Sequence, residues 1–300
     1  MTVSLDVDIT ALCRQFDSKR RLSMLDLSSP VWKELHGPFG SSEAVPGLLQ
    51  QLQEDYTTEV KNELYWEHLF HQDSIYSITY AALPYLAQLA RQSDDPEVKM
   101  DIYATCGILV ANQLTVHSGN LPAEFAHQNP LLAEELVQEI YTTYLTAVEQ
   151  LGMLSEEIFR YAEGAQKDDQ EKRYILAADA AYRGDQAVAG ILLTYSEGDE
   201  YNAACPSCYE EMYIWPNENS PGMTAYSDDP VFNGKENGQA ITPSEIGSVR
   251  PEDSPLARLW QAAHTIKNVQ LLEQLPYLCG HVNCPACGEQ LEIWPELFPL

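Results

Sequence analysis

The 300-residue sequence predicts an all-α fold, an α/α superhelix of paired helices over residues 1–198, followed by a small C-terminal β element over 199–300. Three observations predict it. A seven-residue phrase recurs at an interval of 38 residues, a proline motif recurs at the same interval, and a Cys-Pro-x-Cys unit is duplicated near the C-terminus. The first two indicate a repeat of helix pairs from about residue 20 onward, and the third indicates a β element held by a metal ion.

The recurring phrase predicts an amphipathic helix. Its copies are EVKNELY (59–65), EVKMDIY (97–103) and ELVQEIY (135–141). The apolar second and sixth positions are four residues apart and therefore share one helical face, while the acidic first and fifth positions, such as Glu59 and Glu63, form a neighbouring stripe. We expect Val60, Val98 and Leu136 to be buried at equivalent places in successive helices. The tyrosine that closes each copy is expected to face the core.

Prolines mark a second helix in each pair. Pro46, Pro84 and Pro122 keep the interval of 38, and each follows an apolar residue. Proline suits the first turn of a helix, where its missing N–H is not needed, so a helix is expected to begin near each one. The pattern predicts further helices over 130–151, 155–164, 169–183 and 185–195. A period near 38 is close to that of HEAT and armadillo repeats.

Residues 31–92 carry a more specific resemblance. The segments VWKELHGPFG, AVPGLLQQL and LYWEHLFHQDSIYSITYAALPYLAQL resemble a group of bacterial HEAT-like proteins. The matching positions are Trp32, Leu35, His36, Val45, Pro46, Trp66, Leu69, His71, Gln72 and Tyr76. The segment around Gly37 and Pro38 departs from the family's pattern, so the first turn is expected to differ. Members of this group often resemble immunity proteins of bacterial toxin systems, and the resemblance therefore implies an inhibitor that binds a protein toxin.

The composition is strongly acidic, with 45 Asp and Glu residues against 17 Lys and Arg residues, a formal charge of −28. Such a charge keeps a protein soluble and also attracts a basic protein partner, and the sequence leaves both interpretations open. Phosphate groups would be repelled, which argues against binding of nucleic acid or of an anionic membrane. The sequence shows neither an apolar run of about 20 residues nor a signal-peptide core near its start, and we expect a cytoplasmic protein.

The duplicated cysteine unit predicts a zinc ribbon. Its copies are CPSCYEEMYIWP (205–216) and CPACGEQLEIWP (284–295), each a Cys-x-x-Cys turn followed by a short alternating strand. Four thiolates complete a tetrahedral zinc site, here from Cys205, Cys208, Cys284 and Cys287. The pairs are separated by residues 209–283, far more than the usual spacer of about 15–20 residues. Closing so long a loop costs about 4 kcal/mol, whereas a structural zinc site contributes about 10–16 kcal/mol, so we expect one structural Zn²⁺.

The insertion between the knuckles, 217–283, is expected to contain a loop to about residue 254 and one helix over 254–274. Trp215 and Trp294 are expected to form the small core of the ribbon. Both knuckles lack Lys and Arg and are flanked by glutamates, which favours a structural site over a nucleic-acid contact. Iron in place of zinc, a disulfide or redox pair, and Cys279 or His281 as replacement ligands stay open as alternatives.

Signals for catalysis are weak. Zincin, nucleophile-elbow, Walker A and Rossmann motifs are absent from the sequence. His68 and His71 would share a helical face, and with His36 or a carboxylate they could bind a catalytic metal; the plainer interpretation is that His71 and Gln72 hydrogen-bond a turn between two helices. The sequence therefore predicts a non-enzymatic binding protein with a basic partner. A helical metalloenzyme and a scaffold in a larger complex are the alternatives, and the contact surface is expected on the second helix of each pair.

Overall fold

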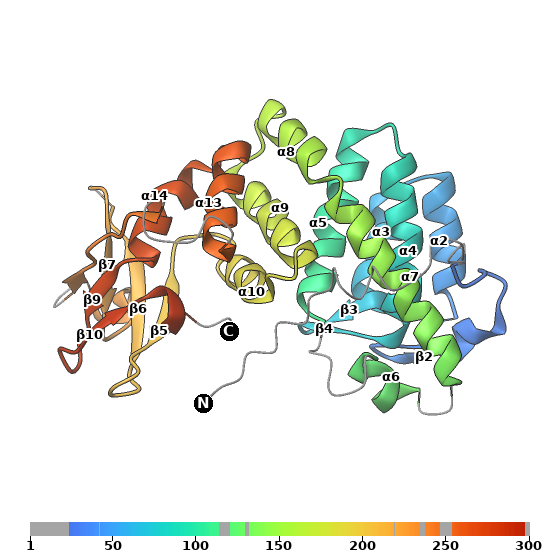
Figure 1. The fold of residues 1–300 in the computed structure, drawn as a ribbon, viewed down its shortest axis with the longest axis horizontal. Helices are drawn as coiled ribbons and strands as arrows, with labels where there is room; N and C mark the ends of the chain where they lie inside the picture. The colour runs from blue at the N-terminus through green and yellow to red at the C-terminus, as the bar shows by residue number, and fades with distance from the viewer. Residues whose placement is uncertain are drawn as a thin grey trace.

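The computed structural model describes residues 24–297 apart from 42, 114–120, 130–131, 219, 235–237 and 247–253. The chain is mostly helical with small sheets. Figure 1 shows the first helices at one end of the long axis and a β-sheet at the other. The helices in order are η1 (Pro30–Lys33), α2 (Val45–Glu54), α3 (Thr58–Asn62), η2 (Glu63–Leu69, π-helical), α4 (Ser77–Gln92), α5 (Pro96–Ala111), α6 (Ala123–Gln128), α7 (Glu134–Gly152), α8 (Ser155–Gly164), α9 (Asp169–Tyr182), α10 (Gln186–Thr194), α11 (Pro230–Asn233), α13 (Pro255–Ile266), α14 (Val269–Leu278) and η3 (Trp294–Glu296).

The interval of 38 residues sets where three helices begin. Helices α3, α5 and α7 start at residues 58, 96 and 134. The sixth position of each phrase is buried, and so is its tyrosine. The second positions, Val60, Val98 and Leu136, lie at corresponding places but are only partly buried against the same core, because they fall in the first turn at the margin of the layer. Helix α7 starts at Glu134, so the expected start at 130 was wrong; residues 130 and 131 themselves lie outside the described part.

The proline expectation is confirmed at two positions and wrong at the third. Pro46 is in the first turn of α2, and Pro122 is the N-cap residue of α6. Pro84 instead lies inside α4. This helix starts earlier because the Thr79 hydroxyl accepts a hydrogen bond from the Tyr76 backbone N–H (3.2 Å). An interior proline costs about 3 kcal/mol, and α4 tolerates it because nearly its whole length is buried in the centre of the helical body.

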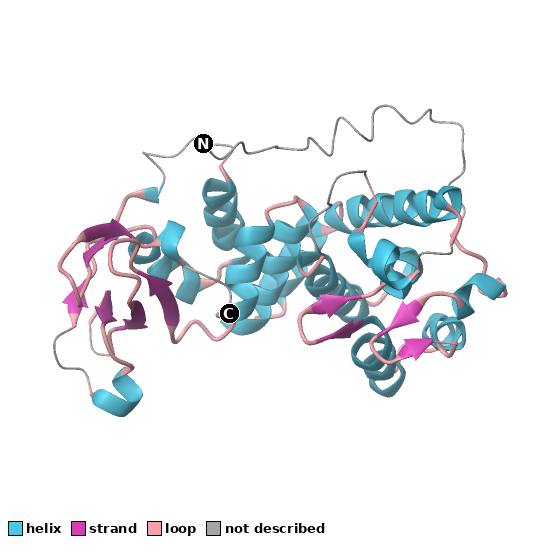
Figure 2. Ribbon diagram, turned by 90° about the horizontal axis from the view of Figure 1, so that it is seen from below, coloured by secondary structure: helices cyan, strands magenta, loops and turns pink. Residues whose placement is uncertain are grey.

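Two short hairpins join first and second helices. Strand β1 (His36–Gly37) pairs with β2 (Gly40–Ser41), and β3 (Phe70–His71) pairs with β4 (Ser74–Ile75). Figure 2 shows these strands well apart from those of the C-terminal sheet. The β3–β4 turn has φ of 47° at Gln72 and 54° at Asp73, as a tight two-residue hairpin requires. His71 is thus in a strand, and the expectation that it shares a helical face with His68 was wrong.

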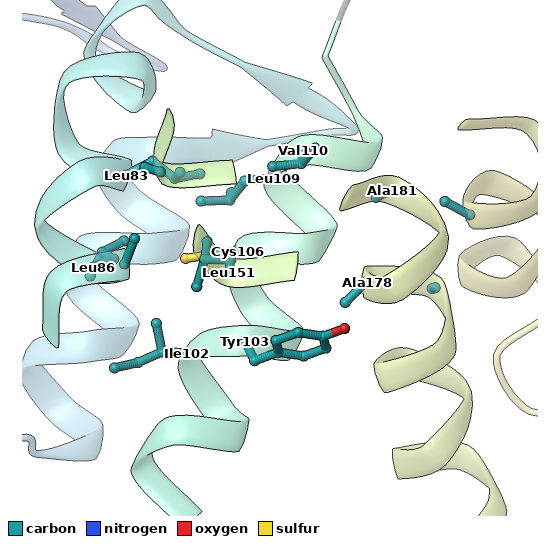
Figure 3. Packing of buried hydrophobic residues seen from close by; sticks show 14 of the residues in the cluster. Leu83, Leu86, Ile102, Tyr103, Cys106, Leu109, Val110, Leu151, Ala178 and Ala181 are labelled. Atoms are coloured by element: carbon teal, nitrogen blue, oxygen red, sulfur yellow. The ribbon is translucent and has the colours of Figure 1, made fainter. Parts of the chain in front are cut away.

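Helices α5 and α9 pack together at a glycine. A Cβ atom added to Gly107 of α5 would lie 2.1 Å from Cβ and 2.4 Å from Cα of Ala178 in α9. Figure 3 shows Ala178 and Ala181 on the side of α9 that faces α5. Small residues on both helices therefore set the close approach of the two helices in the core.

The C-terminal residues build a sheet and a separate hairpin. Strands β5 (Tyr201–Ala204), β6 (Glu211–Pro216), β7 (Met223–Tyr226) and β8 (Gln239–Ala240) form an antiparallel sheet in that order, and β9 (His281–Asn283) pairs with β10 (Gln290–Glu292). The insertion is therefore not a plain loop and one helix. It supplies β7 and β8, and the expected helix is broken into α13 and α14 where Lys267 takes a left-handed φ of 55°. Asn268 then caps α14 by accepting the Leu271 N–H (2.9 Å).

A second apolar core lies between the sheet and the hairpin. Met212 and Ile214 of β6 are buried in it, together with Ile293 after β10. The expectation that Trp215 and Trp294 form this core is confirmed only in part: both are partly buried, and Trp294 packs against the core whereas Trp215 does not belong to it. The alternation of β6 explains the result for Trp215, because residues two apart share a face and Met212 and Ile214 already occupy the inner one.

Arg173 links this sheet to the helices. Its side chain, on α9, is fully buried and donates to the Tyr201 hydroxyl of β5 (2.7 Å) and to Gln274 Oε1 of α14 (3.0 Å). In the described part of the chain, all the groups that accept hydrogen bonds from Arg173 are neutral. Gly198 makes room for the guanidinium: its φ is +66°, and a Cβ there would lie 2.4 Å from Arg173 Nη2. One buried side chain thus joins three elements.

Candidate metal centre

Four cysteine side chains meet where the sheet and the β9–β10 hairpin come together. Cys205 follows β5 and Cys284 follows β9, and Cys208 and Cys287 complete the two knuckles. The four Sγ atoms all lie within 4.8 Å of one another, and among the described residues no other set of three or more His, Cys, Asp or Glu side chains is arranged to hold a metal ion. The structure therefore brings together all four ligands that the sequence predicts.

The two knuckles have the same backbone. In the first, Cys205 N–H donates to the Glu210 carbonyl (3.0 Å) and Tyr209 N–H donates to the Cys205 carbonyl (2.8 Å). In the second, Cys284 N–H donates to the Glu289 carbonyl (2.7 Å) and Gly288 N–H donates to the Cys284 carbonyl (2.9 Å). Tyr209 and Gly288 both take left-handed φ values, 63° and 80°. The repeated sequence thus folds twice into one ligand-presenting turn.

The sulfur positions fit a tetrahedral ion. Cys205 Sγ lies 3.7 Å from Cys287 Sγ, and Cys208 Sγ lies 3.8 Å from Cys284 Sγ. A tetrahedron with metal–sulfur bonds of about 2.3 Å has sulfur–sulfur edges of about 3.8 Å. A disulfide would need about 2.05 Å, and all four cysteines are free thiols. Both close pairs join one knuckle to the other, so a bound ion would cross-link residues far apart in the sequence.

Backbone N–H groups prepare the site for a cation. Burial opposes ionisation of Cys205, but the N–H groups of Cys208 and Ser207 donate to its sulfur and lower its pKa to about 7. The Glu210 N–H likewise favours the Cys208 thiolate, but burial and the neighbouring sulfurs outweigh it and raise the pKa of Cys208 to about 12. One thiolate is therefore available near neutral pH, and a metal ion would favour ionisation of the others.

The other donors considered from sequence do not join this site. Cys279 is buried at the C-terminal end of α14, and neither it nor His281 belongs to the four-sulfur group. Cys106 is buried in the helical core, where desolvation raises the pKa of its thiol above its usual range.

The histidine alternative lacks a site within the described residues. The His36 ring nitrogen Nδ1 lies 3.4 Å from the Asn129 side-chain nitrogen, and the His71 ring packs 5.3 Å from the Phe39 ring. His68 lies on η2. The three imidazoles do not assemble with one another or with carboxylates into a three-donor group. The β3–β4 hairpin places His71 in a strand, so His71 does not share a helical face with His68 as the sequence suggested.

Three comparisons with known proteins were made, against family models, curated proteins and solved structures, and none of them found a match. Among the described residues, no helix is both long enough and apolar enough to cross a bilayer.

Proposed function

We propose that this chain is a non-enzymatic protein-binding module, a HEAT-like α/α superhelix whose acidic surface binds a basic protein and whose C-terminal end is braced by a zinc ribbon. The observation that carries the proposal is the excess of 28 acidic charges together with the place where carboxylates are exposed. Its most specific form, an immunity-type inhibitor of a basic toxin, is supported by the resemblance of residues 31–92 to HEAT-like immunity proteins.

Exposed carboxylates lie on the first helix of each repeat. Glu59 on α3, Glu97 on α5 and Glu135 on α7 are exposed at positions that correspond across the interval of 38. Glu97 is ion-paired with Lys167 (2.7 Å), and Glu63 on η2 is a further exposed carboxylate four residues after Glu59. A row of like charges on successive helices creates a field that accelerates the approach of an oppositely charged protein. These first helices are where we place the contact surface.

One of the second helices, α4, is less suitable than the sequence suggested. Helix α4 is buried along nearly its whole length, between the neighbouring helices α5 and α7, and so it offers little surface to a partner. The burial of α4 therefore argues against a contact surface on this second helix. The acidic edge predicted from the repeated phrase remains accessible on α3, η2 and α7, whereas both of its carboxylates on α5 are paired with lysines.

Zinc is the ion best suited to the four sulfurs. A closed set of four thiolates is typical of structural zinc sites, which need no open coordination position. Iron also takes four thiolates, and X-ray absorption at the metal edge distinguishes the two ions. Acidic residues, including the exposed Glu210 and Glu289, flank the knuckles. We therefore assign the centre a bracing role and not a nucleic-acid contact.

Charge reversal tests the proposed surface. Glu63→Lys is expected to slow association with the basic partner protein several-fold while changing the dissociation rate less, because long-range attraction acts mainly on the encounter rate. Added salt should slow association of the unmodified protein in the same way. The measurement is surface plasmon resonance at two ionic strengths, after affinity capture of the partner from the host's extract by the full-length protein.

The matched control is Glu273→Lys. Glu273 is exposed on α14, far along the chain from the repeats, and its replacement changes the net charge by the same amount. Equal slowing by both reversals, or an acidic partner, would remove the electrostatic basis of the proposal. A partner found only in a multi-protein assembly would instead favour the scaffold alternative.

A further inference from the structure

We propose that the cleft between α8, α9 and α13 binds a small ligand carrying an oxyanion, a carboxylate or a phosphate group. The cleft has a volume of about 440 Å³ and is lined by Ser155, Phe159, Arg160, Arg183, Arg258 and Thr265, among others. That volume lies in the range of small-molecule sites. A ring and hydroxyl groups beside guanidinium groups suit a compact organic anion.

The concentration of arginine is unusual for this chain. Three of its 17 basic residues line one cleft, although the formal charge of the whole protein is −28. Arginine presents a planar fork of donors that matches carboxylate and phosphate oxygens. Two carboxylates line the same cleft: Glu163 is engaged by Lys267 Nζ at 2.6 Å, and Glu156 is exposed on α8, four residues before Arg160. The lining therefore carries three positive and two negative charges, a small positive excess on an acidic protein.

Two of the arginines are held in fixed orientations. Arg183 Nε lies 2.9 Å from Asp179 Oδ2, and Arg258 donates through both Nε (3.2 Å) and Nη2 (2.7 Å) to the Asp185 carboxylate. A carboxylate partner therefore orients each of these two side chains. An oriented guanidinium loses little conformational entropy when a ligand binds.

A buried network fixes one of these carboxylates. Asp179 is buried and accepts a hydrogen bond from Ser155 Oγ (2.7 Å), which itself lies 2.8 Å from the Tyr103 hydroxyl. The chain of contacts connects the floor of the cleft to the core of α5. Such second contacts are what hold a recognition group in place before its ligand arrives.

Arg160 differs from the other two arginines of the cleft, because no carboxylate partner in the described part of the chain offsets its positive charge. It is exposed on α8, and within the described residues it has neither a hydrogen bond nor an ion pair. A ligand oxyanion would therefore meet one unshared guanidinium and two oriented ones. This inference is independent of the proposed protein partner, which is basic and approaches other helices.

Thermal unfolding of the full-length protein tests the site with inorganic phosphate and with malonate, each compared with sodium chloride at equal ionic strength. A ligand that binds only the folded state raises the unfolding temperature in a saturable way. We expect this with at least one of the two anions. Phosphate alone indicates a phosphorylated ligand, malonate alone indicates a carboxylate ligand, and both indicate recognition of oxyanions in general; each result supports the site.

Arg160→Gln is the decisive variant, because an exposed side chain without a partner can be changed without disturbing the fold. It is expected to raise the half-saturating anion concentration about tenfold, the effect of losing one charge-assisted hydrogen bond. Arg91→Gln, at an exposed position near the end of α4, is the matched control and should leave that concentration unchanged. No saturable effect beyond that of sodium chloride, or equal shifts in both variants, would overturn the inference.

Discussion

Cys284→Ser is expected to abolish tight metal binding and to unfold the sheet and the β9–β10 hairpin while α4 and α5 remain folded. One thiolate of the tetrahedron is lost, and with it much of the roughly 10–16 kcal/mol that a structural zinc site contributes. Hydrogen exchange measured by mass spectrometry should show fast exchange in β5, β6 and β9. Protection of α4 and α5 should persist, because their core is separate from the one behind the knuckles.

The control for this experiment keeps every sulfur. Ser207→Ala changes an exposed side chain in the other knuckle, where only the backbone N–H of Ser207 acts on Cys205. It should retain one metal ion per chain and normal protection. If Cys284→Ser also retains both, the four cysteines do not brace this end of the protein. A chelator should reproduce the effect of Cys284→Ser in the unmodified chain.

Gly107→Ala is expected to lower the free energy of unfolding by about 3 kcal/mol, the upper part of the range for an overpacked core. The new methyl group would lie 2.1 Å from Ala178 Cβ, so α5 and α9 would have to move apart. Because Ala178 is itself nearly as small as a side chain can be, no rotamer change relieves the clash. Chemical denaturation followed by circular dichroism gives the value.

Gly47→Ala separates this clash from the general effect of replacing a glycine in a helix. Gly47 lies in α2, and nothing lies within 4 Å of a Cβ added there. Alanine is the better helix former by about 0.5–1 kcal/mol, so this variant should be as stable as the original or more so. Similar destabilisation by both substitutions would contradict the packing described for α5 and α9.

Much of the helical architecture could be predicted, because helix starts leave local signals. The expected helix over 155–164 coincides with α8, and that over 169–183 ends one residue beyond α9. Asp168, the N-cap of α9, accepts the Glu171 N–H at 2.7 Å, a contact between residues three apart in the sequence. The position of Pro84 could not be predicted, since it depends on tertiary burial of α4. The phrase and its period carry no information about that burial.

The metal ligands were predictable because duplication reveals the knuckles at any separation. The strands and helices that the insertion forms were not predictable. Strands β7 and β8 are short, and they extend the sheet from β6 through contacts between Tyr213 and Tyr226 and between Thr224 and Ala240. The arginine cleft was also invisible in the sequence, because Arg160, Arg183 and Arg258 are scattered along the chain and only the packing of α13 against α8 and α9 brings them together.

X-ray absorption at the metal edge of the purified protein tests the central structural claim most directly. We expect one zinc ion per chain with four sulfur neighbours at about 2.3 Å and no nitrogen or oxygen neighbour. That result would join Cys205, Cys208, Cys284 and Cys287 in a single centre, as their sulfur positions indicate. Absence of zinc, or a first shell with fewer than four sulfurs, would contradict the account.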